Sequence, residues 1–441
     1  MKKSIQPKKY FSGTRRNNRA FLRPGSIIEL GSAWAGNSVN CVPYRVDAVR
    51  TQGGLRHLAY FDDAGDVVVA RVDPASGSVA RTRIVNTRKP YDAHQAISLG
   101  IDPLGHVHLA FGAHASTLLV TRSRSAALEN GFEEVREGSE GATYPMFLVL
   151  QEGLVRLYRR GRHPAGEILL DRFNPDRLEW IPANLPLISG LGQPLSCGPY
   201  LNTPIVAPDG SVHLFLVWRL HQTATSAGAV VNVGLDALVS KNGLRSLGTH
   251  GGVESPAPVT PLTSNRVVAV PLGASLINQG SAALLPSGKP AALTYWDAGD
   301  GRPQYKLCWL EGPTWRVSTV SCFQTPFQLN GSGTLPLPHS RPELLVYPDG
   351  RALVLYRSCE VSNTLVALLL DPPDYHLRRG RQQILVDEDL GFYEPVVDRA
   401  AWSERGELVL YIQRCAQGMG RDGQKDIDAA PARLMTWTTI E

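Results

Sequence analysis

Two histidines, His94 and His114, stand on either side of a turn, in a stretch that holds four of the chain's eleven histidines. Between them, residues 96–113 read "AISLGIDPLGHVHLAFGA": an apolar run, the turn "DPLG" and a second apolar run. This pattern predicts a β-hairpin, in which the positions of facing residues sum here to 207 or 208. His94 then faces Ala113 or His114, and we expect the two imidazoles roughly 5–8 Å apart.

Neighbouring imidazoles are suited to proton transfer. The reference pKa of histidine, ~6.5, leaves the side chain mostly neutral at neutral pH, so one imidazole can accept a proton while the other returns one. Which of the two histidines would act as the base stays open at this point.

The same arithmetic on later hairpins places polar or aromatic residues at the corresponding open ends. The facing pairs are Tyr144 with Arg159, Tyr200 with Arg219, Asn278 with Trp296, Arg341 with Arg357, and Glu394 with Arg414. If the strands are equivalent, these ends converge and line a funnel suited to ligand binding. The alternative is that the polar residues only cap strand ends against solvent.

The elements that must position these residues recur along the chain. Seven turns that end in glycine are each followed by a strand-like run, as in "APDGSVHLFLVWR" and "YPDGRALVLYR". Glycine supplies positive φ at low cost, and the runs are rich in β-forming residues. Seven hairpins with room for two more strands each predict an all-β fold, a seven-bladed β-propeller over residues 26–441. Two stacked β-sandwiches are the competing fold.

Composition agrees with an all-β chain: 441 residues include 42 Gly and 32 Pro, too many for a helical protein. Residues 1–25 hold eight Lys or Arg and no acid. We expect a basic tail there that is solvated or disordered, or that contacts a polyanion or a membrane surface. The remaining 37 basic and 40 acidic residues predict no nucleic-acid partner, and no apolar stretch approaches the ~18–20 residues of a membrane span.

The six cysteines form no CxxC pair and no cluster with zinc spacing. We expect core thiols and assign no metal ligand and no cofactor, while disulfides and a structural metal ion stay open.

Several segments together resemble the BNR-4 repeat family. They are "YDAHQAISLGIDPLGHVHLAFGAHAS", "TYPMF", "PYLNTPIVAPDGSVHLFLVWR", "LINQGSAALLPSGKPAALTYWDAGDGRPQYKLCW", "SRPELLVYPDGRALVLYR" and "YEPVVDRAAW". The resemblance covers roughly residues 45–415. The family includes ulvan lyases of polysaccharide lyase families 24 and 25, which are seven-bladed propellers. The resemblance implies β-elimination at a uronic acid beside a 4-linked sugar. It also implies that the catalytic residues are His94, His114, Tyr144, Arg159 and Tyr200.

Such a reaction needs a base for the C5 proton, a donor for the leaving oxygen, and a cation for the carboxylate. The histidine pair suits the first two functions, with Tyr144 and Tyr200 positioning or donating, and the guanidinium of Arg159 suits the third. The remaining funnel residues are expected to bind substrate: Arg219, Asn278, Trp296, Arg341, Arg357 and Glu394. The expected partner is an anionic polysaccharide or oligosaccharide, and we expect a monomer.

Two other functions use the same residues. A non-catalytic glycan-binding propeller would use the arginines and Trp296 for binding alone. A sialidase-like hydrolase would need an arginine cluster and an acidic residue, for which Arg341, Arg357 and Glu394 are candidates. No secretion signal is visible, although the resemblance implies an extracellular or periplasmic enzyme; a cytoplasmic location stays open, as does the identity of the polysaccharide.

Overall fold

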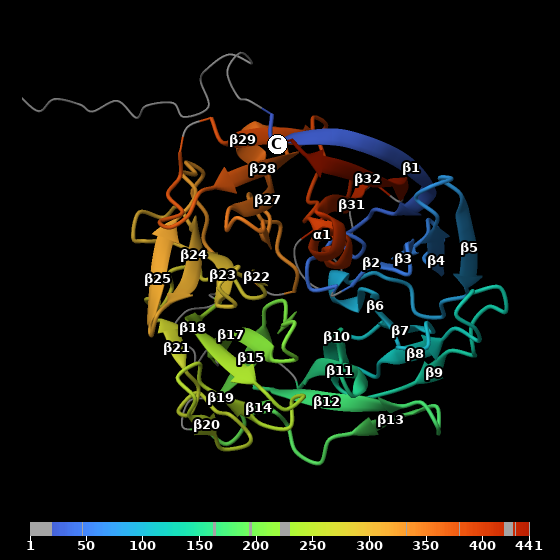
Figure 1. The fold of residues 1–441 in the computed structure, drawn as a ribbon, viewed down its shortest axis with the longest axis horizontal. Coiled ribbons are helices and arrows are strands. Elements are labelled where there is room, and N and C mark those ends of the chain that lie inside the picture. The colour runs from blue at the N-terminus through green and yellow to red at the C-terminus, as the bar shows by residue number, and fades with distance from the viewer. Residues whose placement is uncertain are drawn as a thin grey trace, which may run out of the picture.

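The computed structural model describes residues 20–45, 47–161, 165–193, 196–220, 230–331, 333–378, 380–418, 427 and 429–440. Within these residues almost all regular structure is β-strand, and the sheets are arranged around a common centre (Figure 1). Every strand pair within the sheets is antiparallel. The all-β β-propeller class predicted from the sequence is therefore confirmed.

The first three sheets follow one another along the chain. They are β2 (Val49–Gln52), β3 (Leu55–Phe61), β4 (Val67–Val72) and β5 (Val79–Ile84); β6 (Ser98–Ile101), β7 (Val107–Phe111), β8 (Leu119–Arg122) and β9 (Arg136–Glu137); and β10 (Ala142–Leu150), β11 (Gly153–Arg160), β12 (Glu167–Asn174) and β13 (Glu179–Pro182), with β14 (Ile188–Ser189) paired to β12.

The next three sheets continue the ring. They are β15 (Cys197–Leu201), β16 (Ile205–Val206), β17 (Val212–Leu220), β18 (Asn232–Ser240), β19 (Leu247–Gly248), β20 (Glu254–Ser255) and β21 (Arg266–Val268); β22 (Ser281–Leu284), β23 (Pro290–Trp296), β24 (Gln304–Glu311) and β25 (Thr314–Thr319); and β26 (Glu343–Val346), β27 (Ala352–Ser358), β28 (Thr364–Leu370) and β29 (Gln382–Val386).

The last sheet joins the two ends of the described chain. It has the order β30 (Val396–Val397), β31 (Glu407–Gln413), β32 (Ala429–Thr439) and β1 (Leu22–Trp34), so the N-terminal strand completes a sheet made otherwise from the C-terminal segment. The ladder between β1 and β32 runs from Leu22 opposite Thr439 to Trp34 opposite Ala429. Three short helical elements complete the described structure: η1 (Ala93–Gln95), η2 (Cys359–Val361) and α1 (Arg399–Arg405).

The predicted number of blades is wrong, because six blades are counted rather than seven. The strands nevertheless hydrogen-bond into seven sheets, and these sheets are unequal. Strands β9, β19, β20 and β30 have only two residues each. The β15–β21 sheet has seven strands, of which β17 and β18 have nine residues each and the others have two to five. A turn motif in the sequence marks a hairpin, but it does not tell whether the strands around that hairpin complete a regular blade.

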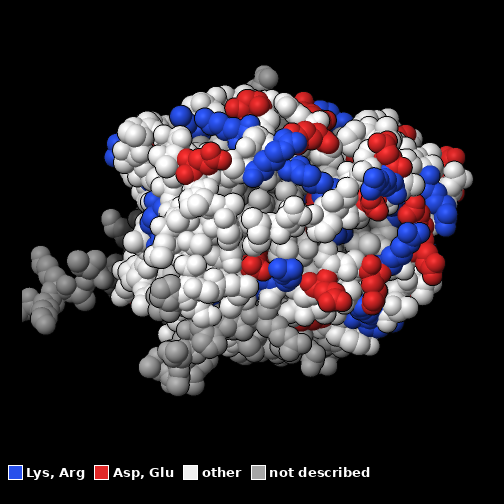
Figure 2. Space-filling model, turned by 90° about the horizontal axis from the view of Figure 1, so that it is seen from below, with Lys and Arg blue, Asp and Glu red and all other residues white. Residues whose placement is uncertain are grey.

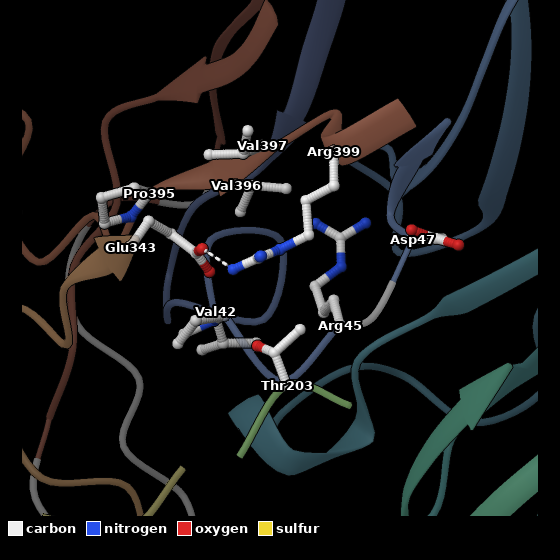
Figure 3. Close-up of a pocket in the computed structure, with 10 residues that line it drawn as sticks. Val42, Arg45, Asp47, Thr203, Glu343, Pro395, Val396, Val397 and Arg399 are labelled. Atoms are coloured by element: carbon white, nitrogen blue, oxygen red, sulfur yellow. Dashed lines mark hydrogen bonds and ion pairs between the residues drawn. The ribbon is translucent and has the colours of Figure 1, made fainter. Parts of the chain in front are cut away.

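Neighbouring sheets pack face to face through side chains that alternate along each strand. Gly100 of β6 shows how close this packing is, because a Cβ there would lie 2.6 Å from the ring of Phe147 on β10. Side chains also leave little space at the ring centre, where the remaining pocket has a volume of about 20 Å³. The residues that line it include Val42, Arg45, Thr203, Glu343 and Arg399. In Figure 3, Arg399 reaches across this pocket to hydrogen-bond Glu343.

Hairpin register agrees with the sequence arithmetic where the strands are regular. Ser98 pairs with Ala110 and Glu343 pairs with Leu355, the registers predicted for the hairpins of His94 and Arg341. The ladders end before the predicted end pairs, because His94 lies in η1 and an isolated bridge joins His339 to Ser358. The arithmetic fails where the pairing shifts. A β-bulge between Thr143 and Met146 places Thr143, not Tyr144, opposite Arg159.

Two other predicted pairings also shift. Arg219 lies opposite Gly198, while Tyr200 lies opposite Val217. Val396 lies opposite Tyr411, one position away from the register that would place Glu394 opposite Arg414. An irregular inner strand therefore moves the facing residue by one or two positions.

Of the predicted basic tail, residues 1–25, positions 1–19 lie outside the described residues. The last part of the predicted tail belongs to β1, which begins at Leu22. Among the described helices, none has the length and apolar character that a membrane crossing requires. All six cysteines are free thiols. Cys41, Cys197, Cys308 and Cys415 are buried as expected, but Cys322 is partly exposed and Cys359 is exposed, so the expectation of core thiols fails for these two.

Candidate functional site

The two histidines meet on one carboxylate. The Nδ1 atoms of His94 and His114 lie 2.6 Å from the Oδ1 and Oδ2 atoms of Asp92, respectively. The two imidazole rings are stacked, with centroids 3.9 Å apart and planes 5° apart. The hydroxyl of Thr334 lies 3.2 Å from Nδ1 of His94. The separation is shorter than the predicted 5–8 Å because the carboxylate draws both rings together.

Local structure explains this arrangement. Asp92 is the N-cap of η1, where its side chain accepts a hydrogen bond from the backbone N–H of His94, and Gln95 completes a capping box. The cap fixes the Asp92 carboxylate beside the start of β6. His114 arrives from the other strand of the hairpin, immediately after β7, so the turn at residues 102–105 brings it to the same carboxylate.

The electrostatics of the group favour a charged Asp92 and a neutral His94. Burial alone would raise the pKa of Asp92, but the His94 charge and the hydrogen bonds from both imidazoles outweigh it and hold that pKa well below its usual range. Burial and then the neighbouring His114 lower the pKa of His94, although Asp92 opposes this. Two stacked imidazolium ions would repel, so the pair favours at most one proton beyond neutrality.

A series of aromatic rings leads away from the histidines. The ring of Tyr44 lies 6.2 Å from that of His94 and 4.8 Å from that of Tyr144, while its hydroxyl donates to the carbonyl of Ala93. Tyr144 lies 5.6 Å from His94 and 5.9 Å from Tyr200, between ring centroids. Through these contacts the histidine pair, Tyr144 and Tyr200 form one continuous cluster.

Tyr144 adopts an unusual backbone conformation. Its φ of 56° is left-handed, which costs energy for a residue with a large side chain, and it lies at the β-bulge of β10. The bulge turns the tyrosine toward the ring centre instead of letting it pair in the ladder. Strained residues of this kind concentrate at functional sites, where the surrounding structure holds them in place.

Two arginines flank Tyr200. The guanidinium carbons of Arg159 and Arg219 lie 4.7 and 4.5 Å from the centroid of the Tyr200 ring. Burial alone would raise the pKa of Tyr200, but the two guanidinium charges outweigh it and lower that pKa. For Tyr144 burial prevails, and its pKa is raised. The two tyrosines of the cluster therefore differ in acidity.

Three further predicted residues complete the cluster. Arg219 donates to Oδ1 of Asn278 over 2.7 Å, and the backbone carbonyl of Asn278 accepts from Nε of Arg341 over 3.1 Å. Arg341 binds both carboxylate oxygens of Glu394, at 2.9 and 2.8 Å. The guanidinium of Arg341 lies 5.8 Å from the centroid of the Tyr44 ring. Because Tyr44 also contacts His94, this contact connects Arg341 to the histidine pair.

Two predicted residues lie apart from these contacts. Trp296 is 8% exposed, belongs to the hydrophobic core and has the ammonium of Lys306 over its ring. Arg357 is 1% exposed and donates to the backbone carbonyls of Leu337, Pro338 and Tyr393. The structure thus gives Arg357 the contacts of a residue that ties loops together.

Sequence reasoning missed Asp92, Tyr44 and Thr334. The capping pattern "DAHQ" was a usable signal for Asp92, because an acidic residue three positions before Gln marks a helix start. Thr334 comes from the segment between β25 and β26, 240 positions from His94, and no local pattern links the two.

Asp92, His94 and His114 also form the one group within the described residues whose ligand atoms could converge on a metal ion, all within 4.8 Å of one another. Both Nδ1 atoms are already engaged with Asp92. A metal ion at this position would have to displace those hydrogen bonds, so the donor set as arranged fits protons better than a metal.

The fold and the site together define a β-propeller in which a carboxylate-bridged histidine pair, two tyrosines and two arginines form one contact cluster. The sequence of residues 56–322, more than half of the chain, matches the model of the BNR repeat-containing family BNR_4. The chain therefore belongs to the BNR repeat-containing family.

Solved structures show the same architecture. The polysaccharide lyase Uly1 superposes with a TM-score of 0.67 at 11% identity, over 96% of this chain and 100% of that one. A PL25 ulvan lyase bound to -[GlcA(1-4)Rha3S]- superposes with a TM-score of 0.65 at 11% identity, over 93% and 95% of the two chains. No curated protein matches the sequence. Identities this low establish a shared fold, while the chemistry must be argued from the site.

Proposed function

We propose that the protein is a polysaccharide lyase that cleaves a uronic-acid-containing anionic polysaccharide by β-elimination. The observation that carries this proposal is the stacked histidine pair on Asp92. Tyr144 and Tyr200 link this pair to two arginines. The similarity to Uly1 and to the PL25 ulvan lyase supports the same reaction class, as does the sequence resemblance to ulvan lyases.

The Asp92 carboxylate sets the tautomers of the pair. An ionised carboxylate only accepts hydrogen bonds, so each Nδ1 carries its proton toward Asp92. In a neutral ring Nε2 then keeps its lone pair and can accept a proton. The side chain of His114 is 28% exposed against 9% for that of His94, so we place the base on His114 and give His94 the role of its stacked partner.

The base removes the C5 proton of the uronate, the electrons of that C–H bond form a C4–C5 double bond, and the C4–O4 bond breaks. Negative charge builds beside the uronate carboxylate during this step. Arg159 and Arg219 are the cations that would neutralise the carboxylate, because their planar guanidinium groups match its two oxygens. Both lie at Tyr200, next to Tyr144 and the histidines.

The departing O4 atom needs a proton. Tyr200 suits this role, because the neighbouring guanidinium charges lower the pKa of its hydroxyl and make it a better acid than Tyr144. Nη1 of Arg341 donates to both carboxylate oxygens of Glu394, and this pair would hold the inner wall of the site in shape. That pairing also argues against a sialidase-like hydrolase, which would need both groups for the substrate.

The test is direct. The purified protein is incubated with ulvan, glucuronan and other uronate polymers, and the 4,5-unsaturated product is followed by its ultraviolet absorbance. Wild type should form the product, and the double variant His94→Ala/His114→Ala should not. Activity that survives in the double variant would refute the role of the pair. Glycan binding without unsaturated product would identify a binding protein, and a saturated reducing end would identify a hydrolase.

A further inference from the structure

A second cavity lies away from the histidine cluster, on the outer strands of two neighbouring sheets. It has a volume of about 410 Å³, within the range of small-ligand sites, and opens between the sheets β6–β9 and β10–β13. Its walls include His108, Arg122, Arg156, Asp171, Phe173 and Trp180. None of the residues that line it belongs to the histidine cluster described above.

The floor of the cavity carries polar atoms that lack partners. Arg156 and Asp171 are each 2% exposed and form an ion pair, and the hydroxyl of Ser139 lies 3.2 Å from Nη2 of Arg156 and 3.1 Å from Oδ2 of Asp171. Nε and Nη1 of Arg156 and Oδ1 of Asp171 have no hydrogen-bond partner. Buried polar atoms without partners are costly. A rotation of the two side chains toward a ligand that supplies both an acceptor and a donor would therefore be favoured.

Aromatic rings form one wall. The guanidinium of Arg156 lies 4.6 Å from the centroid of the Trp180 ring, and Phe173 lies 5.3 Å from Trp180 and 4.4 Å from His108, between ring centroids. Trp180 is the partly exposed ring of the three and offers apolar surface beside the polar floor, while His108 and Phe173 are buried. A ligand that fits must therefore combine an apolar face with hydroxyl-type hydrogen-bonding groups.

The charges around the cavity select against an anion. The acidic residues among those that line it outnumber the basic ones: Asp171, Glu133, Glu134, Glu137 and Glu179 against Arg122, Arg136 and Arg156. Figure 2 shows acidic and basic side chains interleaved over the side of the molecule that carries β9 and β13. The unpartnered donors of Arg156 in turn disfavour a cation, so the ligand that fits is neutral.

We propose that this cavity binds a neutral sugar residue, as a carbohydrate-binding site separate from the histidine cluster. The C–H face of a sugar ring would pack on the aromatic wall, while adjacent hydroxyls would accept from Arg156 and donate to Asp171. The site does not depend on the proposed lyase chemistry, because neither its residues nor its preferred charge are those of a uronate site.

The experiment measures binding of methyl glycosides of glucose, galactose, mannose, fucose, rhamnose and xylose to the full-length protein, by calorimetry and saturation-transfer NMR, with methyl glucuronide as the anionic comparison. The main variant is Arg156→Met/Asp171→Leu, because replacing both members of a buried pair by apolar residues usually preserves folding. The matched control is Arg56→Met/Glu407→Leu, which removes an ion pair between β3 and β31 that lies outside this cavity.

We expect at least one neutral glycoside to bind, and binding to weaken by about 10- to 100-fold in the main variant, the loss expected for hydrogen bonds to charged groups. The control variant should bind as wild type does. If the main variant does not fold, Ser139→Leu, which fills the cavity, should abolish the same binding. Absence of binding by every neutral glycoside, binding of the glucuronide alone, or equal binding by all variants would overturn the proposal. Lyase activity is measured in parallel and should be the same in all variants.

Discussion

Among the described residues, two pairs of histidines have stacked rings, and they are built differently. His94 and His114 share the carboxylate of Asp92 through their Nδ1 atoms. His213 and His250 hydrogen-bond to each other directly, with 3.1 Å between Nδ1 of His213 and Nε2 of His250, and their ring centroids lie 5.3 Å apart. The first pair lies where the inner strand β6 begins, while His213 lies just after the turn that precedes β17.

The difference teaches what makes a histidine pair useful for proton transfer. A shared carboxylate satisfies one nitrogen of each ring and leaves the other for a substrate. In the second pair, Nδ1 of His213 bonds Nε2 of His250 and Ser211 lies 3.2 Å from Nε2 of His213, while Nδ1 of His250 is buried without a partner and Trp315 packs edge-on against that ring. Burial is the main cause that lowers the pKa of both rings, to about 4 for His250. We interpret this second pair as structural.

The strongest way to break this comparison is to remove one imidazole from each pair. His114→Ala should lower kcat for the uronate polymer by about 10²- to 10⁴-fold, the range for loss of a general acid–base group. His213→Ala should leave kcat within about twofold once the folded fraction is matched, because it touches no part of the cluster. Initial rates of unsaturated-product formation check this; equal losses in both variants would remove the distinction between the pairs.

The shared carboxylate is tested by Asp92→Asn. An amide oxygen accepts from one Nδ1–H, while the amide N–H group opposes the other, so one ring adopts the wrong tautomer and kcat should fall by about 10²-fold. Asp92 raises the pKa of His94 against burial, and a proton on His94 would disfavour proton transfer to the stacked base. The neutralisation of Asp92 should therefore also move the acid limb of the kcat/KM profile to lower pH. A pH–rate profile measures this, and an unchanged acid limb would contradict the coupling.

The structural pair should show itself in stability. The folded-state pKa of His250 is about 4, below the unfolded value of ~6.5, so the unfolded chain binds more protons and stability falls as pH drops from about 7 toward 4. For this residue the loss between pH 7 and pH 5 is up to about 2 kcal/mol. Urea unfolding at both pH values should show a smaller loss in His250→Gln. An equal loss in the variant would mean that other groups carry the effect.

The smallest expected effect concerns Thr334, which contacts His94 from a distant segment. Thr334→Val keeps the shape and removes the hydroxyl, and the loss of one hydrogen bond of about 1 kcal/mol should lower kcat by about fivefold with little change in KM. Thr334→Ser should restore the rate. A loss in Val that Ser does not rescue would assign Thr334 a packing role only.

The sequence predicted the propeller class and the meeting of His94 with His114, because a tight turn ending at Gly105 keeps that hairpin in a single register. It could not predict which residue lies opposite Arg159, which is Thr143 rather than Tyr144. The bulge in β10 that causes this shift depends on tertiary packing rather than on a local pattern. It could not find Thr334, whose contact with His94 is set by the path of a long loop. It overcounted the blades because sheets of unequal regularity share similar turns.

The pairing of β1 with β32 has a consequence for biosynthesis. On the ribosome the first strand emerges early, but its partner is made hundreds of residues later, so the nascent chain must wait with one strand edge unprotected until translation is nearly finished. A chain released before β32 is complete would expose that edge to pairing with other chains.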